Sequence, residues 1–323
     1  MDPIIRIEGL TKDYRSGFWR RRVRVLRALS LDVQAGEVFG YLGPNGAGKT
    51  TTLKLLMGLI YPTAGRATIL GRDTREVDMK AAVGFLPENP YFYDYLTGRE
   101  FLDYYGRLFA LPARVRRERV DRLLHEVGMA HAADLSLRKY SKGMLQRIGL
   151  AQALINDPDV VVLDEPMTGL DPLGRKEVRD LILRLKAAGK TIFFSTHIIP
   201  DVEVICDRVG IIFVGELVTV GPLETLLGTH LESVEITFSG LPPGDPGVPG
   251  GPWARPPVRT AGRTIVAVAD QATGNATVRT LVERGATIHS VVPLRRTLEE
   301  EFVQQIEERR RAQGVGHLPE HLP

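Results

Sequence analysis

Eight residues near the start of the chain have the types and spacing of a phosphate-binding loop: Gly43-Pro44-Asn45-Gly46-Ala47-Gly48-Lys49-Thr50. Glycines leave the backbone N–H groups uncovered, so the chain can curl around phosphate oxygens. Lys49 can reach the β- and γ-phosphates of a nucleotide, and the Thr50 hydroxyl can bind Mg²⁺. We predict that these residues, with Thr51, bind the phosphates of a nucleotide.

The sequence on both sides of the loop supports this interpretation. The apolar run Val38–Leu42 precedes it and predicts a buried strand. Apolar residues with helical spacing follow it, beginning at Leu53 and Leu56. The alternative is a glycine turn that binds nothing. A helix that starts directly after the loop favours anion binding, because its free N–H groups and dipole face the phosphates.

A second stretch, Val160 to Glu165, places two carboxylates after an apolar strand. In open parallel sheets, ligands bind at the carboxyl ends of the strands. We expect Asp164 to hold Mg²⁺ directly or through water, and Glu165 to activate an attacking water as a general base. Taken alone, such a strand could simply turn towards solvent, but the phosphate-binding loop upstream favours the catalytic interpretation.

The remaining strands and helices predict an α/β core with an inserted helical region. The runs at Val160–Asp164, Thr191–Ser195 and Arg208–Phe213 are continuously apolar, as in parallel strands buried on both faces. Further strands are expected at 4–8 and about 23–33. Thr97 and Glu100 have the spacing of a capping box, and consecutive helical patterns follow. We therefore predict a helical subdomain over about 96–155.

The sequence changes in character beyond about residue 230. Proline and glycine are dense over about 240–262, which predicts a long loop. Predicted strands and helices surround this loop: strands at 234–238, 264–269 and 287–292, and helices at 276–283 and 297–311. They predict a small α+β domain of ferredoxin-like type over 231–312, and a disordered tail over 313–323.

Charge and hydrophobicity limit the kinds of molecule that the chain is expected to bind. The 323 residues carry a formal charge of only +3, which does not favour nucleic acid as a partner. No apolar run approaches the ~18 residues of a membrane span, and the N-terminus does not resemble a signal peptide. We expect that the chain neither spans a membrane nor is exported through a signal peptide. The basic, aromatic segment 15–22 fits either a solvated loop or contact with acidic lipid head groups or a partner.

The segment Tyr140-Ser141-Lys142-Gly143-Met144-Leu145-Gln146-Arg147 adds a family resemblance. Ser and Gly that open a helix make an anion site, although alone they fit an ordinary N-cap. The segment resembles the L-S-G-G-Q signature of the ATP-binding subunits of ABC transporters, and it precedes the Asp164-Glu165 strand as in that family. Tyr140, Lys142 and Met144 depart from the signature. Ser141 and Gly143, the pair that the resemblance places on the γ-phosphate, are kept.

Other positions resemble the family one by one. Thr168-Gly169-Leu170-Asp171 is similar to the D-loop, so Asp171 would communicate across a dimer interface, or would simply cap a helix. His197, at a strand end, resembles the switch histidine that contacts the γ-phosphate. Tyr14 resembles the aromatic residue that stacks on adenine, with Phe18 or Trp19 as alternatives.

Glu88 stands where the family usually has a glutamine. Its carboxylate can still bind Mg²⁺, but it cannot donate a hydrogen bond as an amide does. The surrounding Leu86-Pro87-Glu88-Asn89 resembles the ABC-2 export group, and the segment from Thr297 to Phe302 resembles the C-terminal accessory domain of that group. The resemblance is strong over about 4–227.

The resemblance implies a P-loop NTPase core of parallel strands over residues 1–230, with an antiparallel β subdomain and the inserted helical subdomain. It implies an ATPase that forms a homodimer around two Mg-ATP molecules, each held between the loop of one copy and Ser141 and Gly143 of the other. The dimer would power export by a separate ABC-2-type permease from the cytoplasmic face of the cell membrane, as a peripheral subunit.

Two other classes of function are considered. A soluble ABC-family ATPase that acts on ribosomes or DNA usually has two cassettes or a long coiled coil, and neither feature occurs in this sequence. An unrelated P-loop kinase or GTPase is disfavoured by the Ser141 segment and by His197.

Overall fold

The structure is a computed structural model, and it describes residues 2–16, 21–227, 231–241, 253–260, 262–295, 298, 300 and 302. The described residues form two compact units, of which the second begins at Glu224. The predicted helix over 297–311, the tail over 313–323, and Phe18 and Trp19 lie largely or wholly outside the described residues.

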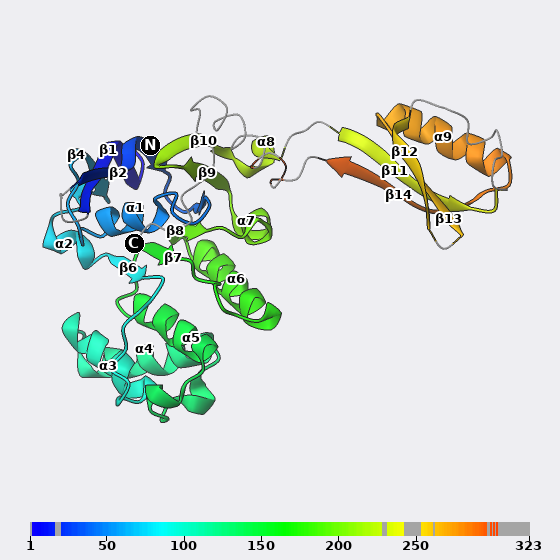
Figure 1. The fold of residues 1–323 in the computed structure, drawn as a ribbon. Helices are drawn as coiled ribbons and strands as arrows, with labels where there is room; N and C mark the ends of the chain where they lie inside the picture. The colour runs from blue at the N-terminus through cyan, green and yellow to red at the C-terminus, as the bar shows by residue number, and fades with distance from the viewer. Residues whose placement is uncertain are drawn as a thin grey trace. The chain divides into compact units, whose positions relative to one another are not determined.

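A six-stranded sheet forms the centre of the first unit (Figure 1). Its order is β10-β9-β3-β8-β7-β6, and only β10 runs antiparallel to its neighbour. The bounds are β3 (Val38–Leu42), β6 (Val83–Leu86), β7 (Val160–Asp164), β8 (Thr191–Thr196), β9 (Arg208–Phe213) and β10 (Glu216–Pro222). Strands β3, β7 and β8 are buried along their whole length. This confirms the prediction from their continuous apolar sequences.

An antiparallel sheet of order β2-β1-β4-β5 packs with this core. Its strands are β1 (Ile5–Ser16), β2 (Arg21–Val33), β4 (Ala64–Ile69) and β5 (Arg72–Asp73). Ile5 and Ile7 of β1 share one hydrophobic cluster with Leu53 of helix α1 (Lys49–Leu56). The strands β1 and β2 extend into the basic segment, where Arg15 pairs with Arg22. The two predicted strands are therefore present and longer than the sequence indicated.

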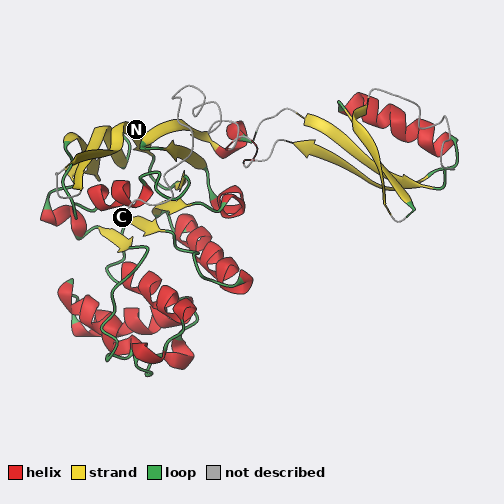
Figure 2. Ribbon diagram, in the orientation of Figure 1, coloured by secondary structure: helices red, strands yellow, loops and turns green. Residues whose placement is uncertain are grey.

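Helices α3 (Gly98–Leu108), α4 (Ala113–Glu126) and α5 (Lys142–Ala153) lie within the predicted 96–155 region (Figure 2). The capping box is present: the Glu100 backbone N–H donates to Thr97 Oγ1 at 3.2 Å, and the Thr97 N–H donates to Glu100 Oε2 at 2.9 Å. Ser141 caps α5, with Met144 N donating to its Oγ at 3.3 Å. The other helices of this unit and its border are α2 (Val77–Lys80), α6 (Pro172–Ala187), α7 (Ile199–Ile205) and α8 (Leu223–Leu226), with 3₁₀ turns at Ala130–Ala132 and Leu137–Lys139.

The second unit is an antiparallel sheet of order β12-β13-β11-β14 with helix α9 (Gln271–Glu283). Its strands are β11 (Leu231–Ser239), β12 (Trp253–Thr260), β13 (Arg263–Val268) and β14 (Thr287–Arg295). Val234, Ile236 and Phe238 of β11 form its core with Leu281 of α9. The helix begins before the predicted residue 276, because Asp270 caps it through a 2.8 Å hydrogen bond from Thr273 N.

One prediction for this unit is wrong. The loop expected over 240–262 contains strand β12. This strand lies at the edge of the sheet and pairs only with β13, with its register shifted between Arg255 and Val258. Proline lacks an N–H donor, and an edge strand needs none on its free side, so Pro256 and Pro257 are tolerated there. Proline content alone therefore could not distinguish this strand from a loop.

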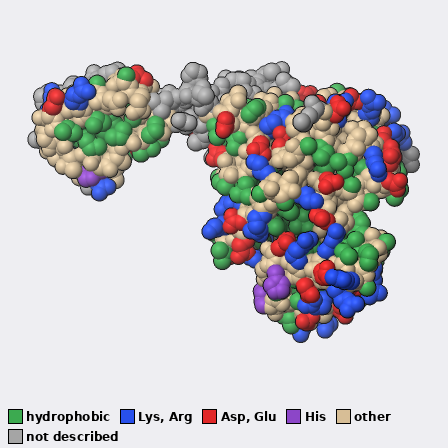
Figure 3. Space-filling model, turned by 180° about the vertical axis from the view of Figure 1, so that it is seen from behind, with side chains coloured by type: hydrophobic (Ala, Val, Ile, Leu, Met, Phe, Trp, Pro, Cys, Tyr) green, Lys and Arg blue, Asp and Glu red, His purple; other side chains and the backbone are tan. Residues whose placement is uncertain are grey.

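Within the described part of the chain, no helix is long and apolar enough to cross a membrane. On the face of the first unit shown in Figure 3, acidic and basic side chains are interspersed. A surface of mixed sign differs from the basic stripe typical of nucleic-acid binding.

Candidate functional site

The phosphate-binding loop connects β3 to α1, and its glycines are required by its shape. Gly46 and Gly48 have φ angles of 77° and 108°, in the region that side chains rarely adopt. A Cβ on Gly48 would lie 2.8 Å from Leu26 Cδ2, and one on Gly43 would lie 2.6 Å from the Ile212 carbonyl oxygen. Larger residues at these positions would displace the loop from the core.

Lys49 lies inside this loop with only 6% of its surface exposed. Its Nζ donates to the Gly43 carbonyl oxygen at 2.7 Å and to the Pro44 carbonyl oxygen at 3.3 Å. It also lies 3.3 Å from Glu165 Oε1. The ammonium is thus held by oxygen atoms, the same type of ligand that phosphate provides.

Asp164 ends β7 and is almost fully buried. Ser195 Oγ donates to Asp164 Oδ1 at 2.5 Å, and the Thr50 hydroxyl also bonds to this carboxylate. Burial raises the pKa of Asp164, and the hydrogen bonds from Ser195 and Thr50 partly oppose that shift. Two hard oxygen groups, the Thr50 hydroxyl and the Asp164 carboxylate, therefore lie together at the start of α1, and this donor set suits Mg²⁺.

Glu165 is fixed by contacts from several elements. Its φ of 50° is uncommon for a residue with a side chain. Its N–H donates to Ser195 Oγ at 3.1 Å, and its carboxylate lies 3.0 Å from His197 Nδ1. Thr168 Oγ1 donates to Glu165 Oε2 at 3.2 Å. One carboxylate thus joins the ends of β7 and β8 to Lys49 of the loop.

These elements surround a cavity of about 600 Å³. The predicted residues that line it are Tyr14, Pro44, Asn45, Gly46, Gly48, Lys49, Thr50, Thr51, Glu88 and Glu165. Gly43 and Ala47 belong to the loop without lining the cavity; Ala47 is buried. Tyr14 lies on the cavity wall, with Lys12 Nζ 5.1 Å from its ring centroid. Residues far apart in the sequence, from β1 to β7, therefore meet at one site.

Three polar residues at this site were not predicted from the sequence. Ser195 Oγ donates to the Asp164 carboxylate and accepts from the Glu165 backbone N–H, and Arg24 and Lys54 line the cavity. A signal for Ser195 existed, because it ends a strand predicted to be parallel to that of Asp164, and the two residues are register partners. No sequence signal marked Arg24, which also pairs with Asp13 across the β1–β2 hairpin.

The remaining predicted residues line a different cavity, of about 410 Å³. Ser141, Gly143 and Asp171 line it together with His131 and Arg147, and it shares no lining residue with the first cavity. Asp171 caps α6, accepting a hydrogen bond from Gly174 N at 2.9 Å. A single copy therefore does not bring Ser141 and Gly143 to its own phosphate-binding loop.

A strand–loop–helix phosphate site beside a strand that ends in two carboxylates defines a P-loop nucleoside triphosphatase. Comparison with known proteins identifies the family. The family model for ABC transporters matches residues 26–168. An uncharacterised ABC transporter ATP-binding protein of Nostoc is 55% identical over 70% of this chain and 69% of its own length. The chain belongs to the ATP-binding proteins of ABC transporters.

One more relative and one solved structure are similar to this chain. A fluoroquinolones export ATP-binding protein of Mycobacterium tuberculosis is 38% identical over 73% of this chain and 77% of its own length. The dimeric structure of an ATP-binding cassette in a post-hydrolysis state, bound to ADP and Pi, superposes with a TM-score of 0.63 at 25% identity. It covers 68% of this chain and 99% of that one. The protein is an ATP-binding ATPase of the transport-coupled ABC type.

Proposed function

We propose that the protein is the ATP-hydrolysing subunit of an exporter, and that it works as a homodimer beside a separate ABC-2-type permease. The observation that carries the dimer is the separation of the two cavities. Lys49 lies in one of them, and Ser141 and Gly143 lie in the other. Only a second copy, placed head to tail, can bring both sets of residues to one triphosphate. That a solved relative is a dimeric cassette supports dimerisation.

In this dimer, Lys49 and the loop N–H groups hold the β- and γ-phosphates, while Ser141 and Gly143 of the other copy contact the γ-phosphate. The complete set of contacts forms only with ATP, so ATP favours the closed dimer and hydrolysis releases it. Tyr14 stacks on the adenine at the cavity wall. Asp171 lies at the interface as well as capping α6.

We assign the magnesium site to Thr50, Asp164 and Glu88. The hydroxyl of Thr50 is already hydrogen-bonded to the carboxylate of Asp164, and Glu88 lines the same cavity as Thr50. A bound Mg²⁺ would neutralise charge on the phosphate oxygens. The family usually has an amide side chain at this position, whereas Glu88 offers a second carboxylate.

Glu165 is the proposed general base. Lys49 and Thr168 hold its carboxylate at the cavity, where it can accept a proton from a water molecule. His197 contacts the same carboxylate and stands at the end of β8. We assign His197 to sensing the γ-phosphate, because a shift of its ring on ATP binding would alter the position of Glu165.

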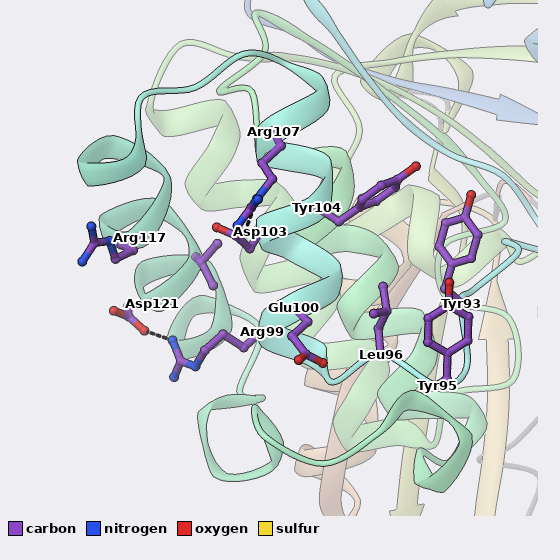
Figure 4. Close-up of a pocket in the computed structure, with 11 residues that line it drawn as sticks. Tyr93, Tyr95, Leu96, Arg99, Glu100, Asp103, Tyr104, Arg107, Arg117 and Asp121 are labelled. Carbon is purple, nitrogen blue, oxygen red and sulfur yellow. Dashed lines mark hydrogen bonds and ion pairs between the residues drawn. The ribbon is translucent and has the colours of Figure 1, made fainter.

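The helical region offers a surface for the permease. A cavity of about 630 Å³ lies along α3 and α4, and Figure 4 shows Tyr93, Tyr95 and Tyr104 on one side of it. Tyr93 and Tyr104 meet edge to face, with 5.5 Å between ring centroids. Tyrosines combine apolar area with a polar tip and are enriched at protein interfaces. We propose that a cytoplasmic segment of the permease binds here and holds the protein at the membrane.

The test is a mild-detergent pull-down of the tagged protein from its own membranes, followed by mass spectrometry. A polytopic membrane protein in about equal amount is expected. Recovery with ribosomal or DNA-bound proteins from the soluble fraction would instead support a soluble ABC ATPase. The double variant Tyr93→Ala/Tyr104→Ala should lose the permease, whereas Tyr61→Ala, at an exposed tyrosine outside the helical region, should keep it.

A further inference from the structure

Lys142 stands between Ser141 and Gly143, where the family signature has glycine, and it begins α5. A cation in the first turn of a helix is disfavoured by the helix dipole. No acidic residue lies in the first turn of α5 to offset it. The positive charge of Lys142 therefore does not stabilise the helix that it begins.

The Lys142 side chain lies along the segment that follows β7. A Cβ built on Gly169 would lie 2.7 Å from Lys142 Cε and 2.8 Å from its Nζ. Gly169, with a φ of 76°, lines the same cavity as Ser141 and Gly143. The ammonium therefore lies beside a residue that lines this cavity, which the proposed dimer places over the nucleotide of the other copy.

Other charged groups at this cavity are already engaged. Arg147 forms an ion pair with Glu177, and Asp171 caps α6. Among the residues that the structure describes, Lys142 has no ion pair or hydrogen bond within the protein. It is an exposed cation beside a cavity that the resemblance assigns to phosphate.

We propose that Lys142 binds the γ-phosphate of the nucleotide held by the second copy, beside Ser141 and Gly143. The inference rests on the proposed head-to-tail dimer. A lysine ammonium is a mobile point charge with three donors, which suits a terminal phosphate. The triphosphate then lies between two lysines, Lys49 of one copy and Lys142 of the other. This second lysine strengthens the selection of ATP over ADP, because ADP lacks the phosphate that it binds.

The experiment measures the dissociation constant of the dimer by analytical ultracentrifugation with Mg-ATP, using Glu165→Gln as the parent. Lys142→Met removes the charge and keeps most of the stem, Lys142→Arg keeps the charge, and Lys139→Met is a control at a nearby exposed lysine. Lys142→Met should weaken the dimer about a hundredfold, as expected for the loss of one charged hydrogen bond, worth about tenfold, at each of its two nucleotides. Lys142→Arg and Lys139→Met should stay close to the parent. ATP binding to the monomer should not change.

A second readout separates charge from packing. Loss of one phosphate contact should make the dimer of Lys142→Met less sensitive to salt than the parent dimer. A parent that remains monomeric with saturating Mg-ATP would overturn the proposed dimer itself. If the parent dimerises and Lys142→Met dimerises equally well, only the role of Lys142 is overturned. Equal weakening by Lys142→Met and Lys142→Arg would also overturn it, because packing would then explain the loss.

Discussion

The two cavities of the first unit differ in how their polar groups are held. Around the phosphate-binding loop, Lys49, Glu165 and His197 bond to one another or to the backbone. Around the second cavity, Ser141 and Asp171 are used as helix caps, and Lys142 has no partner within the described protein. One half of the proposed site is organised by a single chain, and the other becomes a site only against a second copy.

Burial explains this difference. Lys49 and Glu165 are each 6% exposed, and buried charges must be paired to be tolerated. Ser141 and Lys142 are exposed, so water can satisfy them until a partner arrives. The first cavity is therefore preorganised for binding, whereas the second is suited to an interface that opens and closes.

The largest expected effect on ATP binding comes from Lys49→Ala. Removing this buried cation should weaken ATP binding by more than about a hundredfold, since truncating one partner of a charge pair that is buried in a complex costs about 3 kcal/mol of binding free energy or more. Calorimetric titration of the variant with Mg-ATP measures the affinity. The double variant Lys49→Ala/Glu165→Gln should regain thermal stability without regaining affinity. Unchanged affinity in Lys49→Ala would contradict the assigned role of this lysine.

Glu165→Gln should separate binding from chemistry. We expect ATP hydrolysis to fall by about 10²–10⁴, the range for loss of a general base, while ATP binding is kept. The variant should form a dimer with Mg-ATP, which sedimentation can detect. Glu118→Gln, at a surface residue of α4, is the matched control and should hydrolyse ATP normally. A Glu165→Gln variant that hydrolyses ATP at the normal rate would rule out this base.

Mixing two inactive variants tests directly whether the two cavities belong to different copies. Ser141→Ala and Lys49→Ala should each hydrolyse ATP poorly alone. In a mixed dimer, the intact loop of one copy faces the intact Ser141 of the other. Random pairing at equal amounts should restore at most about a quarter of the activity, because half of the dimers are mixed and each has one intact site. No recovery in mixed dimers, isolated through a different affinity tag on each variant, would argue against the head-to-tail arrangement.

The smallest effect is expected at the cavity wall. Tyr14→Ala should weaken ATP binding about tenfold, within the range measured for loss of an aromatic ring stacked on a base. Tyr14→Phe keeps the ring and should bind normally. Fluorescence titration with a labelled ATP analogue provides the measurement, with Tyr91→Ala as a control at an exposed tyrosine outside the cavity. Equal affinity in all three variants would assign adenine stacking to another residue.

Much of the first unit was predictable because its signals are local. The glycines and Lys49 have a fixed spacing, the strands β7 and β8 have apolar centres, and Thr97 with Glu100 forms a cap within one turn. The prediction failed at β12, where the strand is stabilised by pairing with β13 and its own proline-rich sequence suggests a loop. Pairing with a neighbouring strand is not encoded in the composition of the strand itself.

The sequence by itself determined the chemical groups of the site: a loop that can bind phosphate, two carboxylates after a strand, and a signature segment that opens a helix. Only the tertiary structure decided which groups lie together. The parallel register of β7 and β8 places Ser195 beside Asp164, and the same fold puts Ser141 and Gly143 in a cavity apart from Lys49. These contacts join residues far apart in the chain, so their geometry depends on how the sheets and helices pack rather than on local spacing.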